Sequence, residues 1–385
     1  MRKARKGKNM NKIKKQSLLA LAAAGLAFGL VACGDDSSSS SSVAPEEESE
    51  GVTLTGVVFG SDYKTGELRW IDKDEKISEK SLSFHQDSKV IINGSDLYVL
   101  ERLGADNITR INAAKLESDG EDAVTWQVSL DDGANPVDLA FSGDEAWVAL
   151  QNADSLIKIS TKDGKISKSI KTGKFAYEGE TSPYVADIEL NDGKLYVLIQ
   201  RYTYDAATYT STYPLGLLAI YDAKSGDLKD TVQLKAKNPT AMGFFDGALY
   251  VASNGEYNLE GGTDADENRG IEKVNLDKKT SEIIVTGEKL GGGISALATE
   301  GGVAYVGIYK AWGNVPLVKV DLAKKEVKTI EGVADAEGSI AVVDGVVFVG
   351  DRSMGDEKVY KVKDSKASSL KSPKGALPPY SIALF

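Results

Sequence analysis

Short apolar segments alternate with polar turns throughout the chain from about residue 53 onward. Six of the apolar segments share one pattern, an apolar residue followed by an aromatic residue, Val and another small or apolar residue. They are Leu97–Leu100, Ala146–Ala149, Leu195–Leu198, Leu249–Ala252, Ala304–Gly307 and Val347–Gly350. Each is followed by a second short segment, which usually begins with a basic residue, continues with Ile or Val and ends with a polar residue. These are Arg110–Asn112, Lys158–Ser160, Ile220–Asp222, Lys273–Asn275, Lys319–Asp321 and Lys361–Lys363, with a seventh copy at Trp70–Asp72. Runs of this length, bounded by turn residues, predict β-strands.

The spacing of the repeat predicts how many such units the chain holds. Successive aromatic positions are about 43–55 residues apart, which is typical of four-stranded propeller blades. Six complete blades are predicted to begin near Ser88, Asn135, Ser182, Asn238, Gly293 and Gly338. Residues 53–84 supply three further strands, and the last eight residues resemble an innermost strand alone. Joining these pieces predicts an all-β, seven-bladed β-propeller over residues 53–385, closed by N-terminal strands that pair with the C-terminal strand.

The repeat resembles that of the YVTN-type propeller proteins, a broad group of seven-bladed and often exported proteins. Tyr250-Val251-Ala252-Ser253-Asn254 comes nearest to the full signature, while the other copies keep the aromatic–Val pair and lose the Thr-Asn. The resemblance implies the fold. The group is too diverse for it to imply a ligand.

The N-terminal residues 1–32 have the features of a signal peptide. Eight Lys and Arg residues precede the apolar run Leu18–Val31, which is too short to span a bilayer comfortably. The run ends in Leu30-Val31-Ala32-Cys33, which resembles the lipobox of bacterial lipoproteins, and Cys33 is the only cysteine in the chain. The resemblance implies that Cys33 is lipidated and becomes the mature N-terminus. Either Met1 or Met10 is the start, and Met10 leaves a signal of more usual length.

Residues 33–52 are predicted to form a flexible tether, because six consecutive serines and the acidic stretch Glu46–Glu50 follow Cys33. Without the eight basic signal residues, 38 basic residues remain against 57 acidic ones, a net charge of −19. This charge argues against nucleic acid as a partner and against binding to anionic lipid headgroups. We therefore expect a monomer attached to the membrane only through its lipid, in the cell envelope at the outer membrane, on either its periplasmic or its external side.

The alternation of strand direction predicts that one face of the propeller carries the variable loops. The turns between first and second strands are short and uniform, as at Asp192-Gly193, whereas the loops between second and third strands are long and irregular, as at Gln200–Leu215. Long loops are where binding residues concentrate. The candidate aromatic ligand-binding residues on this face are Tyr202, Tyr204, Tyr209, Tyr213, Tyr257, Tyr309 and Trp312. Such residues stack on sugar rings or pack against a partner protein, and they can also pack on one another to support the loops.

A second candidate set comes from aligning the blades at the start of each innermost strand. This position is predicted to ring the channel mouth with Lys89, Asp138, Asp187, Ala241, Ser295, Ser339 and Ser381. Arg102, Arg201 and Arg352 follow neighbouring second strands and belong to the same mouth. The set could hold a polar or carboxylated ligand, or the arginines could simply neutralise Asp138 and Asp187.

One loop carries oxygen ligands at alternating positions, Asp264, Asp266 and Asn268, as calcium loops do. The glycine comes one residue late for an EF-hand and the twelfth position is Asn275 instead of Glu, so calcium is a weak expectation and no other cofactor is expected. His85 is the only histidine, which excludes multi-His metal centres.

These features favour a binding module without catalytic residues, held at the cell envelope by lipid, whose loop-bearing face binds a polysaccharide or a partner envelope protein. Two alternatives stay open. The channel-mouth carboxylates could serve a carbohydrate-active hydrolase or lyase, or the propeller could be a scaffold of an envelope complex.

Overall fold

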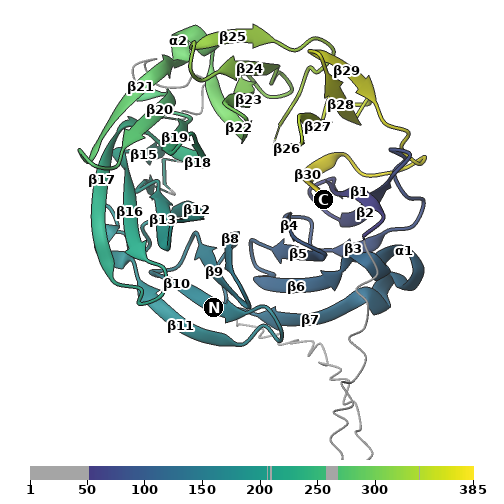
Figure 1. The fold of residues 1–385 in the computed structure, drawn as a ribbon, viewed down its shortest axis with the longest axis horizontal. Coiled ribbons are helices and arrows are strands. Elements are labelled where there is room, and N and C mark those ends of the chain that lie inside the picture. The colour runs from purple at the N-terminus through teal and green to yellow at the C-terminus, as the bar shows by residue number, and fades with distance from the viewer. Residues whose placement is uncertain (1–51, 206, 209, 257–267, 338) are drawn as a thin grey trace, which may run out of the picture. The chain divides into compact units, whose positions relative to one another are not determined.

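Seven four-stranded antiparallel sheets stand around a central channel as the blades of a propeller (Figure 1). The computed structural model describes residues 52–205, 207–208, 210–256, 268–337 and 339–385. The chain divides into two compact units, Met1–Ser49 and Glu50–Phe385, and every described residue belongs to the second. The all-β, seven-bladed prediction is confirmed. No helix within the described ranges is long and apolar enough to cross a membrane.

Within each blade the first strand lies at the channel and the fourth at the rim (Figure 1). Blade 1 is β4 (Ser88–Asn93), β5 (Asp96–Glu101), β6 (Asn107–Asn112) and β7 (Val124–Ser129). Blade 2 is β8 (Pro136–Ser142), β9 (Glu145–Leu150), β10 (Ser155–Ser160) and β11 (Ile166–Lys171). Blade 3 is β12 (Val185–Asn191), β13 (Lys194–Ile199), β16 (Leu215–Asp222) and β17 (Leu228–Lys237).

Blades 4 to 6 repeat the arrangement. Blade 4 is β18 (Pro239–Phe245), β19 (Ala248–Ser253), β20 (Gly270–Asn275) and β21 (Thr280–Thr286). Blade 5 is β22 (Gly293–Glu300), β23 (Val303–Tyr309), β24 (Leu317–Asp321) and β25 (Glu326–Thr329). Blade 6 is β26 (Ile340–Val343), β27 (Val346–Asp351), β28 (Lys358–Lys363) and β29 (Lys366–Ser369).

Blade 7 takes its strands from both ends of the propeller. Its innermost strand is β30 (Pro379–Leu384), followed outward by β1 (Leu54–Ser61), β2 (Gly66–Asp72) and β3 (Leu82–Phe84). Val58 lies opposite Ile382 in the β1–β30 pair, and the Ser61 amide donates to the Pro378 carbonyl across 2.8 Å. The predicted closure of the ring by the two termini is confirmed.

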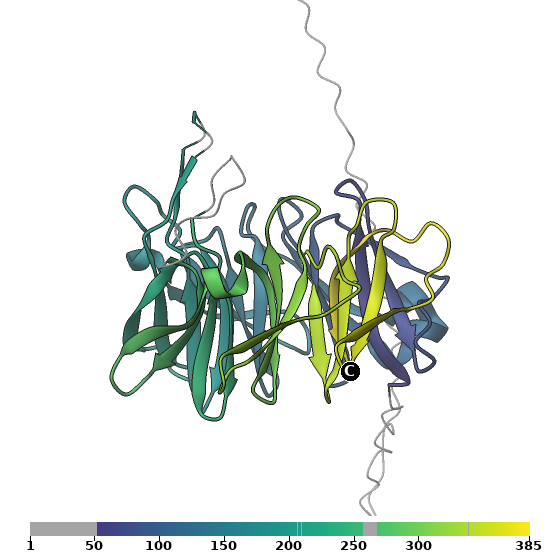
Figure 2. The same ribbon diagram turned by 90° about the horizontal axis from the view of Figure 1, so that it is seen from above.

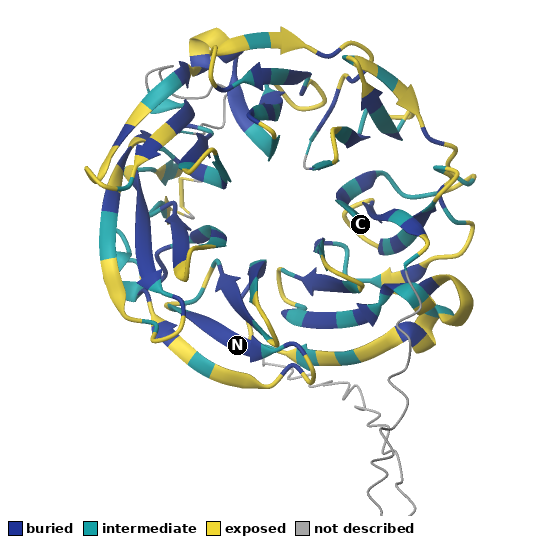
Figure 3. Ribbon diagram, viewed as in Figure 1, coloured by how far each residue is buried: buried dark blue, intermediate teal, exposed yellow. Residues whose placement is uncertain are grey.

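The repeated aromatic position of the second strands lies in the core. Tyr98, Trp147 and Phe348 are fully buried, and Tyr196 and Tyr250 nearly so. Each packs at the boundary between neighbouring sheets, as Tyr98 does against Phe141 of blade 2 with ring centroids 4.9 Å apart. Burial is greatest in the second strands, the channel-side strands are largely half-buried, and the rim strands are mostly exposed (Figure 3). The repeat is therefore a packing signature, since large rings fill the gaps between twisted sheets.

The short turns between first and second strands follow from their Asp-Gly sequences. Asp192 and Gly193 have φ of 48° and 70°, and Asp344 and Gly345 have 52° and 73°. Two successive residues with positive φ form the type I′ turn that suits the twist of a hairpin. Two short helices also interrupt the blades, α1 (Leu116–Asp119) and α2 (Gly287–Leu290). Helix α2 ends at Gly291, whose left-handed backbone closes it.

Candidate functional site at the channel mouth

The connections between second and third strands lie on one side of the ring, which we call the loop face (Figure 2). The longest described one joins β13 to β16. It was predicted as an irregular loop but contains a hairpin, β14 (Thr203–Asp205) and β15 (Thr210–Thr212), in which Tyr204 lies opposite Ser211. The hairpin projects from the loop face in Figure 2.

Aromatic residues near the loop face form two groups, each containing members of the predicted set, and the first group packs on itself. Tyr184 and Tyr202 stack with ring centroids 3.9 Å apart, and Tyr202 contacts Tyr213 at 5.3 Å. Burial raises the pKa of Tyr184 to about 12, and its hydroxyl donates to Glu180 across 3.0 Å. We call these three residues the tyrosine stack. It supports the base of the hairpin, which leaves Tyr204 half-exposed at 50%.

The second group is open to solvent and brings together distant parts of the chain. Tyr63 lies between Trp312 and Tyr380, with ring centroids 6.4 and 6.1 Å away. The Arg352 guanidinium lies 4.7 Å from the Tyr63 ring and 5.5 Å from the Tyr380 ring. Trp312 is 68% exposed. We call Tyr63, Trp312 and Tyr380 the aromatic shelf.

The turns that carry the shelf hold its side chains in place. Asp62 accepts hydrogen bonds from the amides of Lys64 and Thr65 at 2.9 and 2.7 Å, and Tyr63 between them has φ of 63°. A bulky residue keeps this left-handed backbone only where its surroundings impose it. Trp312 lies in a tight turn, which is closed by a hydrogen bond of 3.0 Å from the Asn314 amide to the Ala311 carbonyl. Both rings are thus presented by short, hydrogen-bonded turns.

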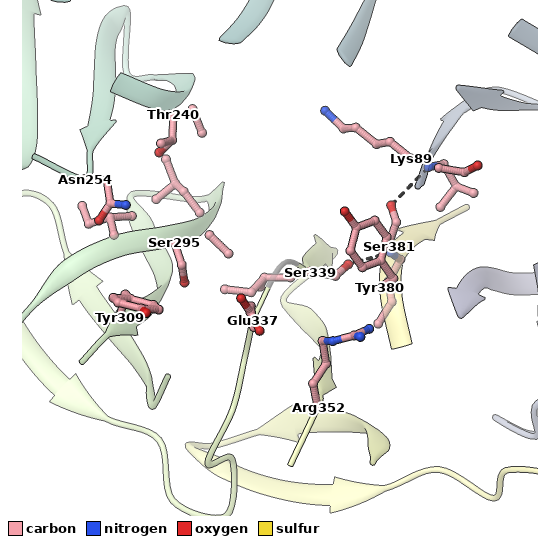
Figure 4. Close-up of a pocket in the computed structure, with 18 of the residues that line it drawn as sticks. Lys89, Thr240, Asn254, Ser295, Tyr309, Glu337, Ser339, Arg352, Tyr380 and Ser381 are labelled. Atoms are coloured by element: carbon pink, nitrogen blue, oxygen red, sulfur yellow. Dashed lines mark hydrogen bonds between the residues drawn. The ribbon is translucent and has the colours of Figure 1, made fainter. Parts of the chain in front are cut away.

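The shelf forms one wall of a cavity of about 830 Å³ at the mouth of the channel, which we call the mouth cavity. Figure 4 shows Tyr380 of the shelf together with the polar residues that line this cavity. Its volume lies in the range usual for small-molecule sites. Tyr309 lines it together with the shelf, and Lys89, Arg102, Arg352 and Glu337 supply its charges. Its remaining polar wall carries Ser88, Thr240, Asn254, Ser295, Ser339 and Ser381. The structure therefore brings Tyr309, Trp312, Arg102 and Arg352 of the predicted set together.

The arginines at the mouth do not neutralise Asp138 and Asp187, so that alternative is wrong. Arg102 binds Asp87, and its Nη2 also donates to the Tyr380 hydroxyl across 3.0 Å. Arg352 donates to three carbonyl oxygens, those of Ser61, Pro378 and Pro379. Arg201 lies apart from the mouth cavity and donates to the Phe175 carbonyl at 3.1 Å. Arg102 and Arg352 instead bind groups at the start of β30 and in the segments beside it.

The partner of Asp138 is Lys89, whose Nζ lies 3.1 Å from Asp138 Oδ1. The ring also contains a regular set of bonds from one blade to the next. Asp138 accepts from the Ile188 amide, Asp187 from Met242, Ser339 from Ile382 and Ser381 from Val90. In each pair the amide lies on the channel-facing edge of an innermost strand, where no neighbouring strand can accept its hydrogen bond.

One predicted member of the ring is wrong. The strand register places Ala296, opposite Gly307, where Ser295 was expected. A bulge between Ile294 and Ala296 takes up Ser295, whose hydroxyl donates to the Gly307 carbonyl at 3.2 Å. In the other complete blades the ring residue lies nine positions before the repeated aromatic residue, as Lys89 does before Tyr98, and the residue nine positions before Tyr305 is Ala296.

Burial and mutual repulsion set the charges of the acidic pair. Burial and the negative charge of Asp138 raise the pKa of Asp187 well above its ordinary value. Burial also acts on Asp138, but Lys89 and a hydrogen bond from Asp187 outweigh it and lower the pKa of Asp138. Burial in the channel opposes the charge of Lys89, yet both carboxylates hold its pKa above the ordinary value. The Lys89 side chain is 40% exposed and lines the mouth cavity.

The carboxylates of the acidic pair are occupied by structural contacts. Asp138 binds Lys89 and accepts the Ile188 amide, and Asp187 accepts the Met242 amide. Neither residue lines the mouth cavity. The pair instead joins blades 2, 3 and 4 through backbone amides.

Several predicted residues lie outside the described part of the chain: Cys33, Tyr209, Tyr257, Asp264 and Asp266. Asn268, the last member of the calcium loop, is described and half-buried. Among the described residues no cluster of three or more His, Cys, Asp or Glu side chains could hold a metal ion.

Sequence reasoning missed Tyr63, Tyr380 and Glu337. A usable signal existed for Tyr63, because residues 53–84 were already assigned to strands two to four of a blade. The turn after β1 is then a second-to-third-strand loop and belongs to the loop face. Tyr380 lies in β30 and Glu337 lies just before β26, so neither belongs to a second-to-third-strand loop and neither gave a comparable signal.

No protein-family model matches the chain, and no curated protein matches its sequence. Solved propellers match its fold. Apo AztD from Citrobacter koseri is 12% identical, with 87% of this chain and 98% of that chain covered and a TM-score of 0.54. A functionally unknown protein from Desulfotomaculum acetoxidans DSM 771 is 12% identical, with coverage of 86% and 98% and a TM-score of 0.55. The dihydro-heme d1 dehydrogenase NirN in complex with DHE is 14% identical, with coverage of 88% and 76% and a TM-score of 0.52. At these identities the likeness shows the propeller fold alone.

Proposed function

We propose that this chain is a lipid-anchored binding module of the cell envelope and that it holds its ligand in the mouth cavity. The observation that carries the proposal is the aromatic shelf, where Trp312 is 68% exposed beside a cavity of about 830 Å³. An exposed large ring beside a polar hollow is typical of a binding site, because solvent contact with that ring is unfavourable until a ligand covers it. The lipid anchor at Cys33 rests on the sequence.

The ligand classes that suit the site are a polysaccharide and a partner envelope protein. The tyrosine stack supports the hairpin by packing on itself, so Tyr202 and Tyr213 act in holding the loop rather than in binding. Tyr204 remains an exposed residue on the hairpin and serves as a matched control for Trp312.

The test uses the full-length lipoprotein purified in detergent. It is run in affinity electrophoresis against cellulose derivatives, xylan, polygalacturonate and peptidoglycan fragments, and in cross-linking against an envelope extract. Trp312→Ala is expected to abolish the interaction found, and Tyr204→Ala to retain it. The reverse pattern would move the site to the hairpin and overturn the proposal.

The anchor is tested separately by metabolic labelling with a fatty-acid analogue. Wild type is expected to incorporate the label, and Cys33→Ala is expected to lose both the label and membrane sedimentation. Labelling of Cys33→Ala would contradict the lipobox assignment.

A further inference from the structure

The cations that line the mouth cavity already have partners inside the protein. Lys89 binds Asp138, and Arg102 binds Asp87 together with the Tyr380 hydroxyl. Asp87 is 8% exposed, so Arg102 is committed to a buried acceptor. Recruiting either cation for a carboxylated ligand would leave a buried carboxylate unpaired, which is costly.

The third cation is equally committed. Arg352 donates hydrogen bonds to three carbonyl oxygens, and its guanidinium lies over two tyrosine rings. Glu337, which also lines the cavity, would repel an incoming anion near this arginine. A cationic ligand would in turn meet Lys89, Arg102 and Arg352 on the cavity wall. The charge arrangement therefore disfavours ligands of either sign.

The remaining wall offers hydroxyl and amide groups that still have unused hydrogen-bonding capacity. Ser339 and Ser381 each accept an amide through Oγ, which leaves the hydroxyl proton to donate (Figure 4). Ser295 donates to a carbonyl and can still accept. Within the described residues, Asn254 Oδ1 is buried at the cavity without a hydrogen-bond partner. Groups that donate and accept in this mixture match the hydroxyls of a sugar.

We propose that the mouth cavity binds an uncharged glycan, with one sugar ring stacked on Trp312 and its hydroxyls facing the serine-bearing wall. The stacking surface is Trp312 because one neighbouring ring, Tyr63, is already covered by Arg352. Stacking places the apolar C–H face of a sugar on the indole and leaves its hydroxyls to bond at the edge. This inference rests on the proposed function and names its ligand class.

The tryptophans of the chain supply a readout for the test. Of the four, Trp70 and Trp147 are 3% and 0% exposed, and Trp126 is half-buried with its Nε1 on the Thr161 carbonyl. Trp312 is thus the residue that a ligand in the mouth cavity would shield. A bound sugar ring is expected to shift its emission to the blue and to protect it from acrylamide quenching.

The experiment titrates the full-length lipoprotein in detergent with cellohexaose, xylohexaose and mannohexaose, and with tetragalacturonate as the charged comparison. At least one neutral oligosaccharide is expected to bind with an affinity that is unchanged between about 0.05 and about 0.5 M NaCl, because no ion pair forms. Trp312→Ala is expected to weaken binding at least tenfold and Trp312→Phe to retain part of it, while Tyr204→Ala leaves binding unchanged.

The outcomes separate this inference from the proposed function. Preferential, salt-sensitive binding of tetragalacturonate, or capture of a protein through Trp312 with no response to the neutral sugars, would overturn the uncharged-glycan assignment and leave the mouth cavity as the site. Binding of a neutral sugar that Trp312→Ala does not weaken would overturn both.

Discussion

Lys89 and Asp138 hold adjacent blades together at the channel, with Nζ and Oδ1 3.1 Å apart. The two residues occupy the same position of β4 and β8, one blade apart in the repeat. At four other places around the ring a side chain accepts a backbone amide of the next blade, but a lysine cannot accept. Blade 1 therefore uses a side-chain ion pair where most blades use an amide bond.

The first prediction concerns this ion pair. Lys89→Met is expected to lower the free energy of unfolding by about 1–2 kcal/mol, because it leaves the mostly buried Asp138 carboxylate without its cation. Asp138→Asn is expected to cost less, since its amide oxygen can still accept from Ile188. Urea unfolding of both variants and of the double variant gives the coupling energy, and a value near zero would show that the pair is not a stabilising contact.

The second prediction uses one of the positions where the ring of amide bonds is interrupted. Ala241 of blade 4 occupies the ring position but has no side-chain acceptor. The amide of blade 5 that it would face is that of Leu297, which has the same place in β22 as Met242 has in β18. Ala241→Ser is expected to raise the free energy of unfolding by about 0.5–1 kcal/mol, and Ser381→Ala to lower it by about 1 kcal/mol. Ala241→Cys is a control of similar size with a weak acceptor. Equal effects of Ser and Cys would point to cavity filling instead.

The third prediction is a pH dependence at Glu189. Burial and the charge of Asp138 raise the pKa of Glu189 from 4.5 to about 7. Between these values the folded state binds more protons than the unfolded state, so stability falls as the pH rises through this window. Glu189→Gln removes the free-energy cost of burying a charged carboxylate. We expect it to be more stable than wild type by about 1 kcal/mol at pH 8, allowing for screening of a half-buried group.

The same variant supplies its own control at low pH. Below the unfolded pKa of 4.5 both states carry a protonated Glu189, so the difference from Glu189→Gln should vanish near pH 4. Chemical denaturation at the two pH values measures both differences. A constant difference across the range would contradict the raised pKa.

The fourth prediction concerns closure of the ring. Deleting residues 379–385 removes β30 and exposes the hydrogen-bonding edge of β1. The truncated chain is expected to unfold at lower denaturant concentration and to aggregate. A synthetic peptide with the sequence of residues 377–385, added in trans, is expected to restore the cooperative transition. Unchanged stability of the truncated chain would mean that closure contributes little.

The fifth prediction separates the two aromatic groups. Tyr202→Ala removes the central ring of the tyrosine stack and is expected to lower the free energy of unfolding by about 1–2 kcal/mol. It is also expected to make the β14–β15 hairpin more sensitive to trypsin, which cleaves at Arg201. Trp312→Ala should change neither, because its ring is exposed. A loss of ligand binding in Tyr202→Ala without a stability change would assign Tyr202 to the site.

The number of blades and the way the ring closes were predictable from the chain alone. Each aromatic–Val strand buries its ring between two sheets, and that requirement recurs in the sequence with every blade. The loop face was predictable for the same reason, since strand direction alternates. These properties depend on contacts within one blade or between successive blades, which a repeat records directly.

The candidate site was only partly predictable. Arg102 and Arg352 were selected correctly as residues of the mouth, and Trp312 was selected only as a residue of the loop face. Arg201 was placed at the mouth wrongly, Tyr63 was missed, and the role expected for the arginines was wrong. Side chains from blades 5, 6 and 7 meet there, and blade 7 comes from both ends of the chain. No local pattern records such a meeting.

The amino-acid sequence by itself determined the fold, because the repeat encodes which residues must leave water. Only the tertiary structure decided which aromatic rings pack together and which stay open, and which charges cancel. Tyr184 and Tyr202 stack, while Trp312 remains exposed, although all three come from loops of the same face. The physical reason is that stacking and charge pairing act over a few ångströms between residues far apart in the chain, so they depend on the closed ring and not on the repeat.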